Sequence, residues 1–306
     1  MVNARPPQDQ LPDRPRELVV TGLDGSGCAR HAAQWAAAEA VRRHGELLLL
    51  HAYALPAAGY SGYNPFPANM LPDLREEGEA ILHDTADALL GDYPSLEITT
   101  RMVYGDAVRV IGEASEGAVL TVVGAHGANR VRVALGSVAA AVAASNPVPV
   151  VVIHPGDPDL AAPVVVGVDG SATSEAAIAF AFEAAALRAA PLTAVHSWTD
   201  RDLDGPLPGY LAAIVDPDPI QQTAQALLSE RLAGWADKYP DVAVRELVVH
   251  DPPTPALLEC ARTAQLMVVG CRGHRGISGM LLGSTSQALI GRGPCPVVVV
   301  RPGIAG

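Results

Sequence analysis

The stretch Pro163-Val-Val-Val-Gly-Val-Asp-Gly-Ser171 decides the fold of this chain, because the chain contains it twice. The earlier copy reads Leu18-Val-Val-Thr-Gly-Leu-Asp-Gly-Ser26, and Gly22 and Gly167 stand 145 residues apart. Each copy is a short apolar run that ends in an Asp-Gly-Ser turn. This pattern is typical of a buried parallel strand that is followed by the N-cap of a helix.

Further matches extend the repeat over the rest of the chain. His51 and His196 follow apolar runs and are again 145 residues apart, and Gly136-Ser137 recurs as Gly283-Ser284. A repeat of this length is a whole domain copied in tandem, not a solenoid unit. We therefore expect four segments, since the junction is polar and rich in proline: a disordered tail over 1–16, a first domain over 17–154, a linker over 155–162 and a second domain over 163–303.

Within each copy, runs of Val, Leu and Ala alternate with Ala-rich amphipathic stretches. In the second copy we expect strands near 163–168, 192–197, 242–249, 266–270 and 296–301, with helices near 173–189, 219–238, 254–264 and 284–292. This alternation predicts an α/β fold of two tandem Rossmann-like, doubly wound domains. Each domain would have a five-stranded parallel sheet of order 3-2-1-4-5, which places ligands at the carboxyl ends of the strands.

Composition and charge exclude several classes of protein. The 306 residues carry a formal net charge of −12, which disfavours binding to a phosphate backbone and predicts no nucleic-acid partner. No apolar run approaches the roughly 20 residues that span a bilayer, and the start of the chain has no apolar signal region, so we expect neither a membrane nor a secreted protein. The four cysteines form no CxxC pair, which favours a reduced, cytoplasmic protein.

The loop after the fourth strand of the second copy is the strongest candidate for a ligand site. It reads Gly270-Cys-Arg-Gly-His-Arg-Gly-Ile-Ser-Gly-Met-Leu-Leu-Gly-Ser-Thr-Ser286. Glycines let backbone N–H groups form a concave anion nest, and the start of the next helix adds free N–H groups. Arg272, His274 and Arg275 add positive charge to an acidic chain. The alternative is a flexible loop with an ordinary serine N-cap, but the coincidence of glycines, cations and hydroxyls favours a phosphate site.

The loop after the first strand carries an aspartate in both copies, Asp24 and Asp169. Neither copy continues with the GxGxxG pattern of a dinucleotide site, and no GxxxxGK[ST] pattern is present. The aspartate would form a turn that caps the next helix, or face the base or ribose of a nucleotide, and both roles are compatible.

The spacing Gly270-x2-Gly273-x9-Gly283-Ser284 resembles the signature of the ATP-binding branch of the universal stress protein family. The similarity covers 18–153 and 163–302, so the whole chain resembles a tandem protein of the mycobacterial and actinomycete type. The resemblance implies that ATP, with Mg²⁺ as an optional companion, would rest on Gly270, Arg272, Gly273, His274, Arg275, Gly276, Gly283, Ser284, Thr285 and Ser286. It further implies that the nucleoside would lie beside Gly167, Asp169, Asp200 and Val249.

The first copy departs from this pattern. Only eight residues separate Gly127 from Gly136, where the second copy has nine, and Val138 and Ala139 replace two hydroxyl residues of the helix start. We therefore predict weaker ATP binding by the first copy. Its candidate site residues are Gly22, Asp24, Gly124, Gly127, Arg130, Gly136 and Ser137.

These features predict an ATP-binding protein that acts as a nucleotide-dependent regulatory switch in a stress response. No Ser-His-Asp set or paired carboxylates recur in the two copies, so we expect slow ATP hydrolysis at most. Two alternatives remain: an interaction module whose first domain has lost nucleotide binding, or an enzyme resembling the adenine-nucleotide α-hydrolases. The last strand of each copy is an apolar edge that favours pairing. We expect the two domains to form an intramolecular pseudo-dimer, and a homodimer remains open.

Overall fold

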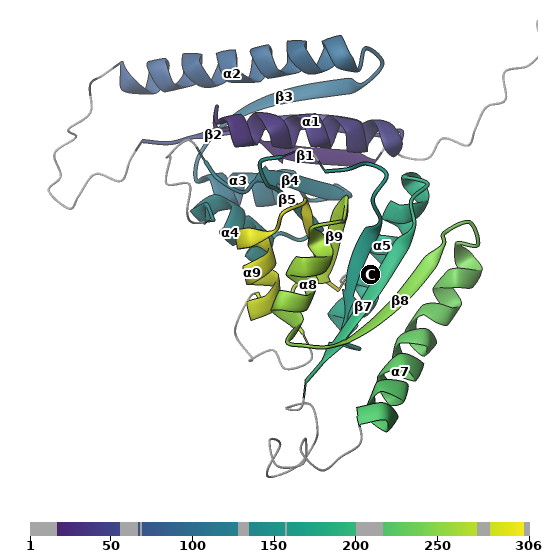
Figure 1. Cartoon of the computed structure of the whole chain (residues 1–306). Coiled ribbons are helices and arrows are strands. Elements are labelled where there is room, and N and C mark those ends of the chain that lie inside the picture. The colour runs from purple at the N-terminus through teal and green to yellow at the C-terminus, as the bar shows by residue number, and fades with distance from the viewer. Residues whose placement is uncertain are drawn as a thin grey trace, which may run out of the picture.

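The computed structural model describes residues 17–55, 67, 69–127, 135–156, 158–199, 217–273 and 282–302 (Figure 1). The first half contains β1 (Leu18–Gly22), α1 (Gly27–Arg42), β2 (Glu46–Tyr53), α2 (Met70–Asp92), β3 (Glu97–Tyr104), α3 (Ala107–Ala114), β4 (Leu120–Gly124), α4 (Ser137–Ser145) and β5 (Val150–Ile153). The second half contains β6 (Val164–Val168), α5 (Ala172–Leu187), β7 (Leu192–Trp198), α7 (Pro217–Lys238), β8 (Val244–His250), α8 (Pro253–Ala261), β9 (Leu266–Gly270), α9 (Ser284–Arg292) and β10 (Val297–Val300). The tail predicted for 1–16 lies outside the described residues.

One sheet runs through both halves in the order β3-β2-β1-β4-β5-β10-β9-β6-β7-β8. Within each half the strands are parallel, and their order is the predicted 3-2-1-4-5. The halves join where β10 pairs antiparallel with β5, with Val297 opposite Val152 and Val299 opposite Val150. The doubly wound fold is therefore confirmed in each half, and the two apolar last strands cover each other's edges.

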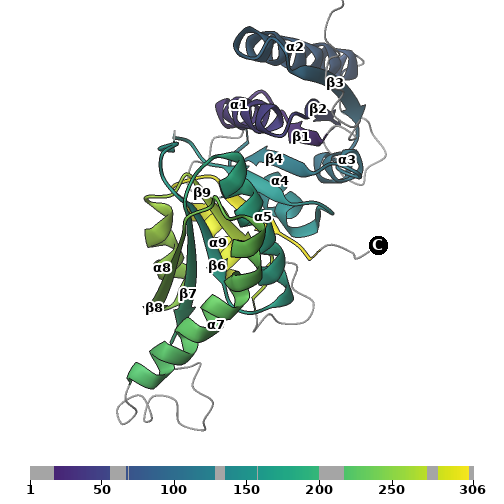
Figure 2. The same cartoon turned by 90° about the vertical axis from the view of Figure 1, so that its right-hand side faces the viewer.

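Helices cover both faces of the sheet (Figures 1 and 2). Side chains of α1, α2, α5 and α7 join one buried cluster, and those of α3, α4, α8 and α9 join the other. Alternation along a strand decides which cluster a residue enters, because successive side chains point to opposite faces. Thus Val151 belongs to the first cluster and its neighbours Val150 and Val152 to the second. Both clusters continue across the β5–β10 join, so the halves share their core.

A buried ion cluster joins α1 of the first half to α5 of the second. The fully buried Glu39 carboxylate accepts hydrogen bonds from Arg43 at 2.9 Å and from Arg188 at 2.5 Å. Arg43 also donates to Glu183 at 2.6 Å, and so contacts both halves. Burial by itself would raise the pKa of Glu39, but the positive charges of Arg188 and Arg43 outweigh burial and hold it below its usual value.

None of the helices that the structure describes is long and apolar enough to cross a membrane.

Candidate functional site

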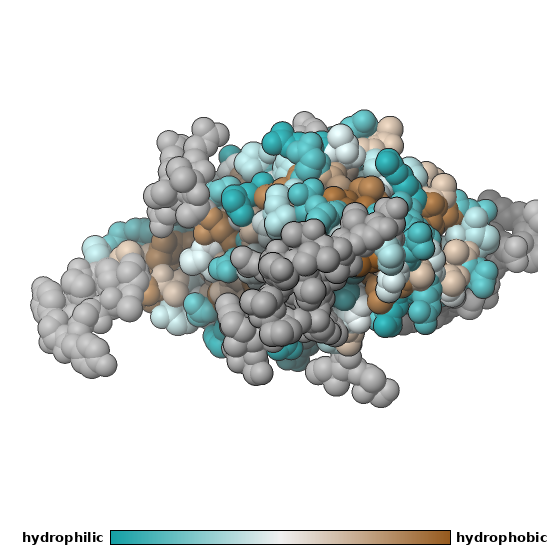
Figure 3. All heavy atoms as spheres, turned by 60° about the horizontal axis from the view of Figure 1, so that its bottom comes forward, coloured by the Kyte–Doolittle hydropathy of each residue, from teal (hydrophilic) through white to brown (hydrophobic). Residues whose placement is uncertain are grey.

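The carboxyl ends of β6 and β9 bring two loops together in the second half. The two strands are parallel neighbours, so the loop after Val168 and the loop after Gly270 leave the same edge of the sheet. A Cβ atom added to Gly273 would lie only 2.6 Å from Oδ2 of Asp169, which shows that the loops are in contact. Figure 3 shows the molecule with the bottom of Figure 1 turned forward, and apolar and polar side chains are mixed on this face.

The Asp169 loop is a tight turn that caps α5. Gly170 has a φ of +79°, a conformation that favours glycine. Oδ1 of Asp169 accepts hydrogen bonds from the backbone N–H of Ser171 at 3.0 Å and from its hydroxyl at 2.6 Å. The Ser171 hydroxyl in turn accepts from the N–H of Ser174, so it caps the helix. Asp169 therefore forms the turn while its other oxygen faces Gly273.

Two hydroxyl groups fasten the β9–α9 loop at its base. Thr173 donates a hydrogen bond to the carbonyl of Arg272, and Ser286 donates to the carbonyl of Gly270 at 2.7 Å. Gly270 also packs directly on α5, because a Cβ there would lie 2.7 Å from Oγ1 of Thr173. Ser286 is almost fully buried, and its hydroxyl is already bonded to the carbonyl of Gly270. A ligand would therefore contact the backbone N–H of Ser286 and not its hydroxyl.

The first turn of α9 has the features of an anion site. Its N-cap is Gly283, which makes no side-chain cap, whereas α5 is capped by Ser171. The N–H of Gly283 donates to the carbonyl of Cys271 at 2.8 Å, which holds the loop against the helix start. Within the described part of the chain the N-cap gives no side-chain hydrogen bond to the N–H groups over Ser284–Ser286, and these groups and the positive end of the helix dipole favour a bound phosphate or carboxylate.

The first half repeats this framework with fewer hydroxyl groups. The N–H of Gly136 donates to the carbonyl of Ala125 at 2.8 Å, and a Cβ on Gly127 would lie 2.8 Å from Oδ2 of Asp24. Cys28 takes the place of Thr173, and its thiol contacts the carbonyl of Ile153 at 3.4 Å. The helix start is again uncapped at Gly136, but the hydroxyl of Thr285 is replaced by Val138. The first half thus offers fewer polar groups to a ligand.

Several further predicted site residues lie at or near the ends of strands and pack against helices. A Cβ on Gly22 would meet Ile111 of α3 at 3.0 Å, and one on Gly167 would meet Leu257 of α8 at 3.1 Å. These two glycines let a helix approach the sheet. A Cβ on Gly124 would lie 2.9 Å from the carbonyl carbon of Cys28, so this glycine lets α1 come close to β4. Val249 is a half-buried residue of β8 that packs against the second core cluster. Five further predicted residues lie outside the described residues: Arg130, Asp200, His274, Arg275 and Gly276.

Sequence reasoning did not single out Thr173 and Ser174, which position the Asp169 loop. The Ser174 hydroxyl accepts a hydrogen bond from the N–H of Asp169 at 3.2 Å and is almost fully buried. The signal was present in the run Ser171-Ala-Thr-Ser174, which has hydroxyl residues where the first copy reads Ser26-Gly-Cys-Ala29.

In the described parts of the two facing loops, each half carries backbone hydrogen-bond donors and one aspartate, Asp24 or Asp169. Among the residues that the structure describes, no group of three or more His, Cys, Asp or Glu side chains could hold a metal ion. His196 lies below the loop, where its Nδ1 contacts the carbonyl of Val168 at 2.8 Å and helps to fix the strand end. The arrangement therefore suits the binding of an anionic ligand through backbone N–H groups.

Comparisons with known proteins agree with this architecture. A family model described as "Universal stress protein family" matches residues 16–154 and 162–301. Universal stress protein Rv2005c of Mycobacterium tuberculosis is 38% identical over 296 residues, which cover 94% of this chain and 98% of that protein. Universal stress protein Rv2623 of the same organism is 36% identical over 293 residues, which cover 92% and 96%.

Solved structures share the fold along nearly the whole chain. A universal stress protein from Archaeoglobus fulgidus aligns with a TM-score of 0.70 at 20% identity, over 94% of this chain and 97% of that one. A functionally unknown protein from Pseudomonas aeruginosa, PA1789, aligns with a TM-score of 0.61 at 17% identity, over 94% and 93%.

Proposed function

We propose that this chain, which belongs to the universal stress protein family, binds ATP at the carboxyl edge of its second half and acts as a nucleotide-dependent switch in a stress response. The observation that carries the proposal is the uncapped start of α9 at Gly283, beside a loop that is fastened against Asp169. Phosphates would accept hydrogen bonds from the N–H groups of this helix turn and of the glycine-rich loop. Mg²⁺ would enter with the nucleotide, held largely by the phosphates themselves.

The proposal includes a difference between the halves. The first half keeps the uncapped glycine at the start of α4 but has Val138 where the second half has the hydroxyl of Thr285 in the first turn of the helix. Fewer donors around the phosphates mean a weaker complex, because charge-assisted hydrogen bonds to phosphate are among the stronger ones. We therefore assign the tighter site to the second half.

We also propose that the domains, 17–154 and 163–303, work as an intramolecular pseudo-dimer. The antiparallel pairing of β5 with β10 and the buried Glu39 cluster support this pairing of the halves. A cytoplasmic location belongs to the same proposal. It is supported by four free cysteines, since disulfides are rare in a reducing compartment.

The test is nucleotide binding by the purified full chain. Native mass spectrometry would identify a nucleotide that co-purifies and would also show whether two chains associate. ATP titration, followed by the shift in melting temperature, would give the affinity. Detection of ADP over time would separate a switch from an enzyme with rapid turnover.

Gly273→Ala supplies the decisive variant, because its Cβ would lie 2.6 Å from Oδ2 of Asp169 and push the two loops apart. We expect at least about a tenfold loss of ATP affinity, or about 1.4 kcal/mol. Gly291→Ala is the matched control, since a Cβ there meets no atom within 4 Å. Gly127→Ala, the equivalent change in the first half, should have a smaller effect. Absence of any nucleotide effect in the unmodified chain would instead support an interaction module.

A further inference from the structure

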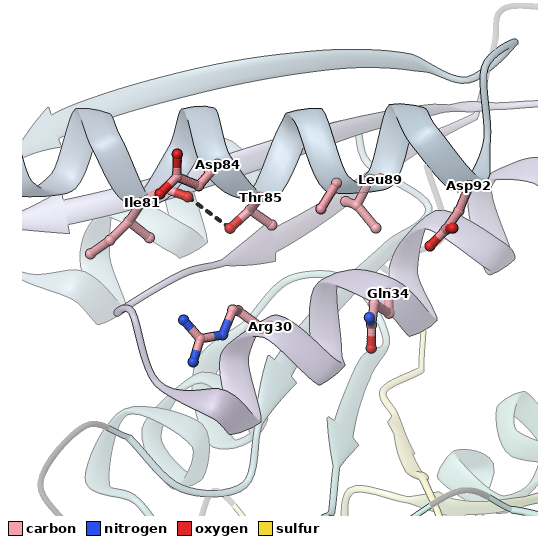
Figure 4. A pocket seen from close by; sticks show the side chains of 8 residues that line it. Arg30, Gln34, Ile81, Asp84, Thr85, Leu89 and Asp92 are labelled. Atoms are coloured by element: carbon pink, nitrogen blue, oxygen red, sulfur yellow. Dashed lines mark hydrogen bonds between the residues drawn. The ribbon is translucent and has the colours of Figure 1, made fainter.

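A groove between α1 and α2 lies in the first half, on the face of the sheet that these helices cover (Figure 4). It encloses about 150 Å³, and its lining includes Arg30, Gln34, Asp84, Thr85, Leu89 and Asp92. One end adjoins the β1–α1 loop, because a Cβ on Gly25 would lie 2.9 Å from Ile81, another lining residue. The buried Leu89 and Thr85 form the floor, and the exposed charged residues form the rim.

The second half shows which side chains occupy the equivalent space, because the two halves can be matched residue by residue. Tyr93 follows α2 and donates its N–H to the carbonyl of Leu89, just as Tyr239 follows α7 and donates to that of Trp235. Leu89 therefore occupies the position of Trp235, and Asp92 that of Lys238. The 145-residue offset between α1 and α5 likewise matches Ala37 with Phe182.

In the second half the groove is closed by rings and a cation. Phe182 stacks on Trp235 at 6.1 Å and on Tyr239 at 5.8 Å between ring centroids. The ammonium of Lys238 lies 5.0 Å from the centre of the Trp235 ring. An ion pair of 3.0 Å between Arg231 and Glu175 spans α7 and α5 above these rings.

The first half lacks the corresponding side chains. Ala37 and Leu89 are much smaller than the aromatic residues they replace, and Thr85 cannot form the ion pair that Arg231 makes. A space of about 150 Å³ is the size that holds one aromatic ring. Asp92 stands at the position of Lys238, so a carboxylate replaces the ammonium group. Compared with the second half, the groove therefore lacks an aromatic ring and, at the end of the rim near Asp92, a positive charge.

The rest of α2, like Asp92, is mainly negatively charged. Its exposed acidic residues, besides the two aspartates of the rim, outnumber its one arginine, Arg75; they are Asp73, Glu76, Glu77, Glu79 and Asp87. A cation that approaches this helix is attracted, and one held next to an aromatic ring gains a further cation–π interaction. Arg30 is the positive residue on the opposite rim, and in Figure 4 it lies at the end nearest Asp84, away from Asp92.

We propose that this groove docks an aromatic side chain carried on a positively charged segment of a partner protein. The ring would occupy the volume beside Leu89 that Trp235 fills in the second half. The adjacent positive charge would face Asp92, as a counterpart of Lys238. The groove lies between α1 and α2 of the first half, whereas the tighter nucleotide site is proposed at the carboxyl edge of the second half.

Three small indoles test the proposal on the full chain: tryptamine as a cation, indole as a neutral ring and indole-3-acetate as an anion. We expect ligand-observed NMR to detect tryptamine binding, with an affinity several times that of indole and with indole-3-acetate weakest. No detectable tryptamine binding at millimolar concentration, or equal binding of the anion, would overturn the proposal.

Variants that introduce residues of the second half into the first half test whether tryptamine binds in the groove. Leu89→Trp, which places the Trp235 ring of the second half in the floor of the groove, should fill it and abolish tryptamine binding without changing the shift of melting temperature caused by ATP. Asp92→Lys needs no repacking and should lower tryptamine affinity about fivefold or more. Asp87→Lys is its control, with the same change of charge on the same helix outside the groove. Equal losses for the two lysine variants, or undiminished binding by a folded filled variant, would refute docking in the groove.

Discussion

Replacement of Glu39 by glutamine should destabilise the whole chain, because this carboxylate compensates two buried arginines that come from different halves. Glu39 is fully buried, and the side chains of Arg43 and Arg188 are 4% and 5% exposed. The change removes one negative charge with almost no change in shape. Arg43 keeps Glu183 and Glu17 as partners, whereas Arg188 keeps the carbonyl of Ala184 at 3.1 Å and the ring of Trp35, neither of which carries a charge.

The expected loss is about 3 kcal/mol of unfolding free energy, at the lower end of the 3–5 kcal/mol that removal of one partner from a buried ion pair costs. The control is Glu79→Gln. Glu79 pairs with Arg75 at 2.8 Å, but the side chains of the pair are 53% and 64% exposed. Exposed pairs contribute at most about 1 kcal/mol, so the control should lose less than that.

Urea unfolding followed by tryptophan fluorescence gives both values, since Trp35 lies under the guanidinium of Arg188 at the cluster itself. The pH dependence adds a second readout. The pKa of Glu39 is lower in the folded protein than its ordinary value of 4.5, so its contribution is complete above pH 4.5 and is lost as the pH falls below it. Glu39→Gln should therefore flatten the acid side of the stability profile.

The repeat supplies a rescue experiment. Ala184 stands 145 residues after Glu39, at the matching position of α5, and it is fully buried. In the Glu39→Ala background, Ala184→Glu should restore part of the lost stability by returning a carboxylate to the two arginines from the other side. A loss for Glu39→Gln no larger than that for Glu79→Gln would refute the reasoning, because the arginines would then not depend on this charge.

Three further predictions concern single side chains. Ser171→Ala removes the N-cap of α5 and should cost about 1 kcal/mol in urea unfolding, while leaving the fold intact by circular dichroism. Burial raises the pKa of Cys295 to about 12, so its thiol should stay protonated and unmodified by iodoacetamide at pH 8 unless the protein is unfolded. Burial lowers the pKa of His154, whose Nε2 donates a hydrogen bond to the carbonyl of Ile290 at 3.0 Å and so joins the two halves. The contribution of His154 to stability is therefore complete above pH 6.5 and decreases as the pH falls below that value. His154→Gln should reduce this loss of stability at low pH, as measured by melting temperatures at a series of pH values.

The candidate site could be predicted only in part. The glycine spacing around Gly273 and Gly283 pointed to the loop that the structure places against Asp169, because the need for small residues at a close contact is visible in the sequence. The hydroxyl of Ser286 could not be assigned, since its partner, the carbonyl of Gly270, belongs to a strand end sixteen residues away. Nothing in the sequence tells a hydroxyl that faces a ligand from one that faces the protein.

The sequence by itself determined the repeat, the alternation of strands and helices and the strand order within each half. These features depend on local apolar patterns and on the right-handed connection between parallel strands, which hold for any chain of this kind. The tertiary structure decided which differences between the copies meet in space. Glu39 serves two arginines because α1 and α5 meet across the join of the sheet, and the groove between α1 and α2 is open beside Leu89, at the position that Trp235 fills in the second half. Both depend on packing between segments far apart in the chain, which no local pattern encodes.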